Sequence, residues 1–187
     1  MGKTRNGETA DGGTGGPPLA QAAAQAVNAS GRRGPPPVHL WNPPHCGHSR
    51  MRILRDGAWL HEGTPIGRPA LVRLFASILR RDPHEHVLVT PAERMTVDVD
   101  DTPFLAVDVE ATPDGLLFAT NLGDAVLAGP GHAVEARDGD GPTLHVRHGL
   151  LARLDRKTYL RLVDLCDERD GRLLARSAGA TFDLGPL

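Results

Sequence analysis

The sequence predicts an α+β fold of two similar domains, each a curved antiparallel sheet partly wrapped around one amphipathic helix. Three observations lead to this prediction. Two stretches carry the apolar spacing of a surface helix, short strand patterns with turn residues surround both, and the patterns recur in the same order, as an internal duplication would produce. With 187 residues, 40% of them hydrophobic, the chain is long enough for one or two domains.

The elements of the first half are a hairpin, a helix and two short strands. The segment RMRILRDGAWLHEG (50–63) predicts a hairpin, because Asp56-Gly57 suits a type I′ turn and would pair Leu54 with Trp59. The segment RPALVRLFASILRRD (68–82) predicts a helix with Pro69 in its first turn. Its two terminal arginines would complement the helix dipole. The apolar stripe of this helix consists of Leu71, Leu74, Phe75, Ile78 and Leu79.

The second half opens with two strands, FLAVDVE (104–110) and LLFATN (116–121), around an Asp-Gly turn. The segment RKTYLRLVDLCDERD (156–170) predicts a helix with Asp155 as N-cap. Short turns favour antiparallel pairing throughout. Since both helices are followed by similar strand patterns, VLVT with TVDV and LLAR with TFDL, we align helix with helix and place domains at residues 38–102 and 103–187. Chance similarity of two α+β stretches is the alternative.

The N-terminal segment, residues 1–37, is rich in Gly, Pro and small polar residues. Such a composition predicts disorder, with a short helix in LAQAAAQAVNAS (19–30). This run does not fit a signal peptide, because two glutamines interrupt it and no basic residue directly precedes it. No other segment is long enough to span a bilayer, so we expect no membrane contact.

Charge and cysteine content limit the function classes. The chain has 21 basic and 23 acidic residues, a formal net charge of −2, and so lacks the positive field that nucleic-acid binding requires. Cys46 and Cys166 lie far apart in a chain that needs no disulfide, which indicates free thiols and a cytoplasmic location.

The stretch PPHCGHSRMR (43–52) places His45, Cys46 and His48 within four residues. Zinc requires about four converging ligands, and no second ligand pair is evident, so we predict neither a metal nor another cofactor. Motifs of the common hydrolases and nucleotide-binding proteins are absent. A Cys46 nucleophile activated by a neighbouring imidazolium is a weaker alternative.

Two polar turns, TPAER (90–94) and TNLGD (120–124), are the candidate functional loops. Together with nearby arginines they would line a cleft between the domains and hold a small anion through guanidinium bonds. Ordinary turn hydrogen bonding and local salt bridges are the competing explanation. The candidate ligand-binding residues are Arg68, Thr90, Glu93, Thr120, Asn121, Asp124, Arg147, Arg153 and Arg156.

The motifs HLWNPPHCGHSRMRILRDGAWLHEGTPIGRPALVRLF, VLVTPAE, FATNLGD and LHVRHGLLARLDR together resemble the bacterial domain-of-unknown-function family 1285, over residues 38–161. The resemblance implies two similarly built domains and suggests ligand binding or a part in signal transduction, without catalytic residues. His48 departs from it, since an acidic residue is expected there.

We therefore expect a non-enzymatic cytoplasmic module that binds a small anionic ligand or a protein partner. The alternative is an enzyme with an acid/base site in the cleft, using Glu93 or Asp124 with His132. A third hypothesis is a pure interaction protein whose N-terminal segment recruits partners.

Overall fold

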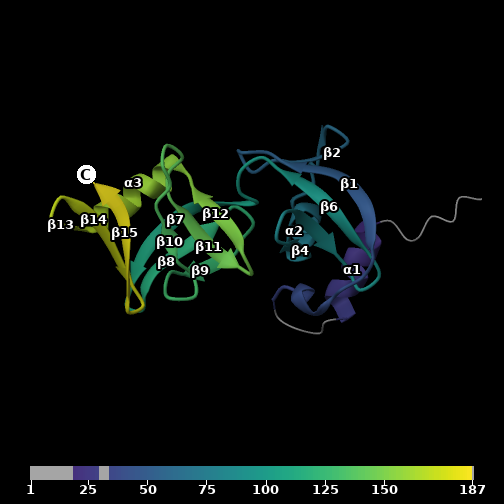
Figure 1. Cartoon of the computed structure of the whole chain (residues 1–187), viewed down its shortest axis with the longest axis horizontal. Coiled ribbons are helices and arrows are strands. Elements are labelled where there is room, and N and C mark those ends of the chain that lie inside the picture. The colour runs from purple at the N-terminus through teal and green to yellow at the C-terminus, as the bar shows by residue number, and fades with distance from the viewer. Residues whose placement is uncertain (1–18, 30–33, 187) are drawn as a thin grey trace, which may run out of the picture.

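A computed structural model describes residues 19–29 and 34–186 and places two curled six-stranded sheets side by side (Figure 1). The first sheet has the order β3-β2-β1-β6-β5-β4, and the second has the order β10-β11-β12-β7-β8-β9. The first sheet consists of β1 (His45–Ile53), β2 (Trp59–His61), β3 (Thr64–Pro65), β4 (Leu79–Arg81), β5 (His86–Val89) and β6 (Arg94–Val99). The second consists of β7 (Phe104–Thr112), β8 (Gly115–Thr120), β9 (Ala125–Leu127), β10 (Val134–Glu135), β11 (Thr143–Arg147) and β12 (Leu150–Leu154).

The two sheets share one topology, which confirms the prediction of two similar α+β domains. Numbered from the first strand of each domain, both sheets have the order 3-2-1-6-5-4. Their neighbouring strands are antiparallel except for one pair in each sheet, β1 with β6 and β7 with β12, which is parallel. A parallel pair cannot be joined by a short turn. It arises because the first and last strands of each domain meet in the middle of the sheet, an arrangement that turn lengths do not reveal.

The helices occupy different places in the two domains. Helix α2 (Pro69–Ser77) connects β3 to β4, whereas α3 (Arg156–Asp164) follows β12. The strands after α3 form a separate three-stranded sheet of β13 (Asp167–Arg169), β14 (Arg172–Ser177) and β15 (Ala180–Pro186). Aligning helix with helix therefore related the wrong elements, because a helix followed by an antiparallel meander gives the same local pattern in both places.

Helix α2 is shorter than the apolar stripe predicts. It ends at Ser77, and Leu79–Arg81 instead forms β4, which pairs with β5. Phe75 in the helix and Ile78, which caps its C-terminal end, both remain buried in the core. The Arg80 side chain, expected at the helix terminus, donates to Asp82 and to the carbonyl oxygens of Val38 and Trp41. Strand pairing has overridden helix propensity at this position.

Helix α3 begins as predicted, because Oδ1 of Asp155 accepts a hydrogen bond of 2.7 Å from the Thr158 backbone N–H. It ends at Asp164 rather than near Gly171, since residues 167–169 form β13. Cys166 is half-buried just beyond the helix, and burial raises the pKa of its thiol to about 11. This thiol is therefore protonated and unreactive at neutral pH.

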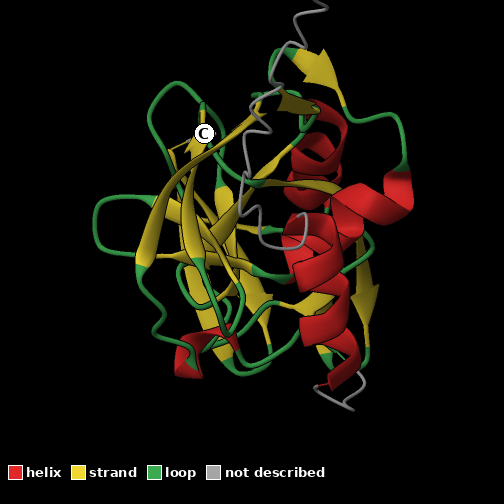
Figure 2. Cartoon of the chain, turned by 90° about the vertical axis from the view of Figure 1, so that its right-hand side faces the viewer, coloured by secondary structure: helices red, strands yellow, loops and turns green. Residues whose placement is uncertain are grey.

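The N-terminal helix α1 (Leu19–Ala29) packs against α2, and Ala23 is fully buried. In Figure 2 the helices lie to one side of the strands in projection, although α3 belongs to the second domain and only α1 and α2 pack together. A short 3₁₀ helix, η1 (Val38–Leu40), then leads into β1. Of the predicted disordered segment, residues 34–37 are also described and Pro36 is buried, whereas residues 1–18 and 30–33 lie outside the described residues. Across the ranges that are described, no helix is long and apolar enough to cross a membrane.

The predicted hairpin joins β1 to β2, with a register one residue from the expected one. Trp59 pairs with Ile53 instead of Leu54, because Leu54 N–H bonds to the Ala58 carbonyl and lengthens the turn. Gly57 adopts a φ of +84° in this turn. Trp59 is 2% exposed and joins the core, and Trp41 packs against that core half-buried.

Candidate ligand site between the two domains

The β1–β2 hairpin of the first domain lies against the β8–β9 turn of the second. A Cβ atom on Gly57 would lie 2.7 Å from Nδ2 of Asn121 and 3.1 Å from a methyl group of Leu105. Only glycine combines this close approach with a positive φ. The TNLGD turn, predicted from sequence as a functional loop, therefore lies at the junction of the domains.

Hydrogen bonds within the TNLGD turn fix its shape. Thr120 Oγ1 accepts from the backbone N–H of Asp124 at 3.0 Å and donates to Asp124 Oδ2 at 3.2 Å. Asn121 Oδ1 accepts from the backbone N–H of Leu105 at 3.0 Å. The expected turn chemistry is thus present, and it leaves the Asn121 amide NH2 group directed at the neighbouring hairpin.

Arg147 links the two domains. Its Nη1 donates to Asp124 Oδ1 at 2.8 Å, its Nη2 donates to the Ala76 carbonyl oxygen in α2 at 3.0 Å, and its guanidinium lies 4.9 Å from the centroid of the Phe104 ring. These contacts use the groups that would otherwise bind an anion. The Arg147 guanidinium, which the sequence predicted would bind an anionic ligand, is therefore bound to groups of the protein itself.

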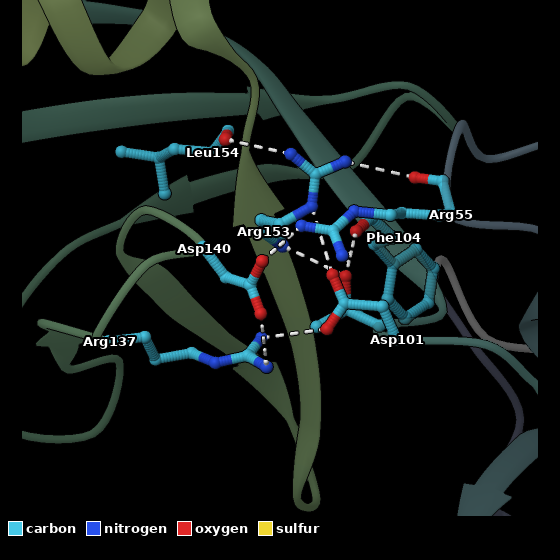
Figure 3. A network of polar contacts seen from close by, with 8 residues as sticks. Arg55, Asp101, Phe104, Arg137, Asp140, Arg153 and Leu154 are labelled. Atoms are coloured by element: carbon cyan, nitrogen blue, oxygen red, sulfur yellow. Dashed lines mark hydrogen bonds and ion pairs between the residues drawn. The ribbon is translucent and has the colours of Figure 1, made fainter.

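Arg153 belongs to a second network across the junction, shown in Figure 3. Its Nε lies 2.9 Å from Asp101 Oδ2, and its Nη2 donates to the Arg55 carbonyl oxygen at 2.9 Å. Arg137 donates to the other oxygen of Asp101, and Arg55 pairs with Asp140. The hydrogen bond from Arg55 holds the pKa of Asp140 below its ordinary value. This network joins the hairpin of the first domain to the second domain.

The remaining predicted residues are not brought together with these. Thr90 and Glu93 form the β5–β6 turn, where Thr90 Oγ1 accepts from the Glu93 backbone N–H at 3.2 Å. That turn precedes β6, whereas the far end of β6 leads to the junction, roughly 20 Å away along six residues of strand. Arg68 and Arg156 start α2 and α3, both exposed. No hydrogen bond or ion pair joins either side chain to another residue that the structure describes.

A pocket of about 270 Å³ lies where the hairpin, the start of α2 and the TNLGD turn meet. Its walls are mainly apolar and come from both domains. Trp59, Pro65, Ile66, Val72 and Leu122 supply them, and Arg73 and Asn121 are the polar members. Apolar walls with a few placed polar groups are typical of small-molecule sites.

Trp59 is the most informative residue of this pocket. Its indole Nε1 is buried and finds no hydrogen-bond acceptor within the described part of the chain. A buried tryptophan N–H usually has a partner, and leaving such a donor unsatisfied costs about 1–3 kcal/mol. Neither Trp59 nor Arg73 was predicted as a site residue. The sequence feature that could have identified Trp59 is the Asp56-Gly57 turn, because this turn places Trp59 at the junction of the domains.

The His-Cys-His stretch begins β1 on an exposed surface. His45 Nε2 lies 3.0 Å from Thr96 Oγ1, and His48 Nε2 lies 3.2 Å from Asp98 Oδ1. His48 Nδ1 accepts from the Arg50 backbone N–H at 2.8 Å, so both of its ring nitrogens are occupied. Among residues 19–29 and 34–186, no three His, Cys, Asp or Glu side chains are arranged to hold a metal ion.

Two of the three residues of the acid/base alternative, Asp124 and His132, lie close together. Asp124 and His132 line a second pocket of about 260 Å³ beside Arg147, whereas Glu93 lies at the far end of the first sheet. His132 Nδ1 lies 3.0 Å from the His145 carbonyl oxygen, which only accepts, so the neutral tautomer that makes this hydrogen bond has its proton on Nδ1 and its lone pair on Nε2. Asp124, in contrast, is paired with Arg147 and Thr120.

The fold and the junction define a class of protein: two half-barrel α+β domains in tandem, with a pocket between them. The chain belongs to the DUF1285 family, a family of unknown function, whose N-terminal domain model matches residues 36–102 and whose C-terminal domain model matches residues 103–184.

Two solved structures are similar to this chain. A DUF1285 family protein from Silicibacter pomeroyi DSS-3 is 45% identical, with a TM-score of 0.78 over 88% of this chain and 95% of that one. A DUF1285 family protein from Shewanella baltica OS155 is 32% identical, with a TM-score of 0.52 over 61% of this chain and 90% of that one. No curated protein matches the chain.

Proposed function

We propose that the protein is a small-molecule-binding module whose ligand lies in the pocket between the two domains. The observation that carries this proposal is the mainly apolar pocket built by both domains, with Arg73 and Asn121 as its polar members. A ligand in this pocket would contact both domains at once.

Binding is favoured over catalysis because of what lines the pocket. Arg73 is its single titratable lining residue, and arginine stays protonated in proteins. General acid/base catalysis requires a group that exchanges protons near neutral pH. His132 in the second pocket has the lone pair that such a role needs, and this observation favours the enzyme as the second candidate.

A small ligand is favoured over a protein partner by the distribution of exposed apolar side chains. Leu40, Leu160 and Leu165 are the large exposed hydrophobic residues in the described ranges. Leu40 lies in η1, and the other two lie at α3 of the second domain. Protein interfaces are marked by contiguous apolar patches, which these separate positions do not suggest.

Native mass spectrometry of freshly purified protein tests the proposal. We expect a co-purifying small molecule in the wild type, and its loss in Leu122→Trp, which fills the pocket from the second domain. Arg156→Ala is the control, because Arg156 lies outside the pocket. Retention of the molecule by folded Leu122→Trp would contradict the proposed site, and a bare wild-type mass would count against the function.

A further inference from the structure

We infer that the ligand of this pocket is a small anion with an apolar body, such as a short-chain or single-ring carboxylate. This inference rests on the proposed function and names its ligand class. It starts from the polar side-chain groups in the pocket wall, which are hydrogen-bond donors without a free acceptor.

The donors that line the pocket are the Asn121 amide NH2 and the Arg73 guanidinium. Tryptophan and arginine side chains offer no acceptor, and Asn121 Oδ1 is already taken by the Leu105 N–H. The wall contains no Asp, Glu, Ser, Thr, Tyr or His side chain. A ligand that must donate hydrogen bonds, or that carries positive charge, would find no side-chain partner here. A ligand rich in acceptors would satisfy both donors.

The charge around the pocket points in the same direction. Arg68 lies between the lining residues Gly67 and Pro69, and its side chain makes no hydrogen bond or ion pair to the described chain. Helix α2 starts without a side-chain cap and without an acidic residue in its first turn. The positive end of its dipole is therefore uncompensated. An anion near Arg68 and Arg73 would be stabilised by two guanidinium groups and by this helix start.

The remaining wall sets the nature of the ligand body. Pro65, Ile66, Val72 and Leu122 surround the space beside the Trp59 ring. The volume of about 270 Å³ lies just below the range of drug-sized pockets, roughly 300–1,000 Å³. Burial of apolar ligand surface contributes about 0.8 kcal/mol per methylene. An anion that lacks an apolar body, such as acetate or inorganic phosphate, would lose this contribution.

Fluorescence titration tests the inference, with Trp41→Phe leaving Trp59 as the single tryptophan. The probes are hexanoate, benzoate and cyclohexanecarboxylate, each compared with its neutral amide, and acetate and inorganic phosphate as anions without a body. We expect at least one of the three carboxylates to bind at least tenfold more tightly than its amide, and at least tenfold more tightly than acetate or inorganic phosphate. Arg73→Gln should weaken that carboxylate about tenfold or more and leave its amide unchanged. Arg156→Gln is the control and should bind like the parent.

The outcomes separate the two proposals. Equal binding of amides and carboxylates, or an unchanged carboxylate affinity in Arg73→Gln, would overturn the anion and leave the binding module standing. Tightest binding of inorganic phosphate would overturn the apolar body. If none of the compounds changes Trp59 fluorescence at millimolar concentration, the ligand class fails, and the native mass spectra of the wild type and Leu122→Trp decide separately whether the pocket binds another molecule.

Discussion

Arg147 of the second domain donates a hydrogen bond of 3.0 Å to the carbonyl oxygen of Ala76 in helix α2 of the first domain. This bond joins residues 71 positions apart and uses a carbonyl near the end of the helix, where the dipole is negative. The same guanidinium pairs with Asp124 in the TNLGD turn. The orientation of α2, which forms one wall of the pocket, is therefore coupled to the turn that forms another.

Replacing Arg147 by alanine should lower the free energy of unfolding by about 3 kcal/mol, because it leaves Asp124 without its counter-ion in a mostly buried site. Urea denaturation measures this change. Arg176→Ala is the matched control, since Arg176 pairs with Asp167 at an exposed position and should cost less than about 1 kcal/mol. Equal losses in the two variants would show that Arg147 is not a domain link.

Stability should fall as the pH drops from 6.5 toward 4. Burial, and after it the charge of Arg81, lowers the pKa of His86 from 6.5 to about 4. A lowered folded-state pKa favours the neutral ring, so its contribution is complete above pH 6.5 and is lost as the pH falls through 4. The full shift corresponds to about 3 kcal/mol, and partial exposure reduces this to about 2 kcal/mol.

Thermal melts of His86→Gln across this pH range check that expectation. The variant should lose less stability on acidification than the wild type, because glutamine stays neutral. His84→Gln, in the exposed preceding loop, is the control. If folded His86→Gln lost as much stability on acidification as the wild type, the effect would come from other groups. One such group is His148, whose pKa is also lowered by burial.

Gly115→Ala should destabilise the second domain severely, by roughly 3 kcal/mol or more. Gly115 has a φ of +137°, and a Cβ there would lie 2.8 Å from the Ala178 backbone nitrogen and would also clash with Ser177 Oγ. Gly63 has a φ of +78° and open space around it. Gly63→Ala should therefore lower the free energy of unfolding by only about 1–2 kcal/mol, through backbone strain alone. Similar melting temperatures for the two variants would contradict the packing of the β14–β15 hairpin on β7–β8.

Local features of the fold were predictable from sequence because neighbouring residues decide them. The Asp155 cap, the Asp56-Gly57 hairpin and the core position of Phe75 depend on residues a few positions apart. The parallel pairing of β1 with β6 depends on how the whole sheet curls, and no local pattern records that. For the same reason, Leu79 fits a helical stripe and a buried strand equally well.

The candidate site was predictable only in part. The TNLGD turn is polar and rich in turn residues, and it does lie at the junction. The partners of Arg147 and Arg153 could not be predicted, since Ala76 and Arg55 belong to the other domain. That the Trp59 indole N–H has no acceptor could not be predicted either, because the sequence does not show which polar groups surround a buried indole.

The most direct test of the account is a crystal structure of the protein grown with whichever of hexanoate, benzoate and cyclohexanecarboxylate binds most tightly. We expect ligand density between Trp59 and Leu122, with a carboxylate oxygen within hydrogen-bond distance of the Arg73 guanidinium or the Asn121 amide NH2 group. An empty pocket at saturating ligand, or a ligand bound elsewhere on the chain, would contradict it.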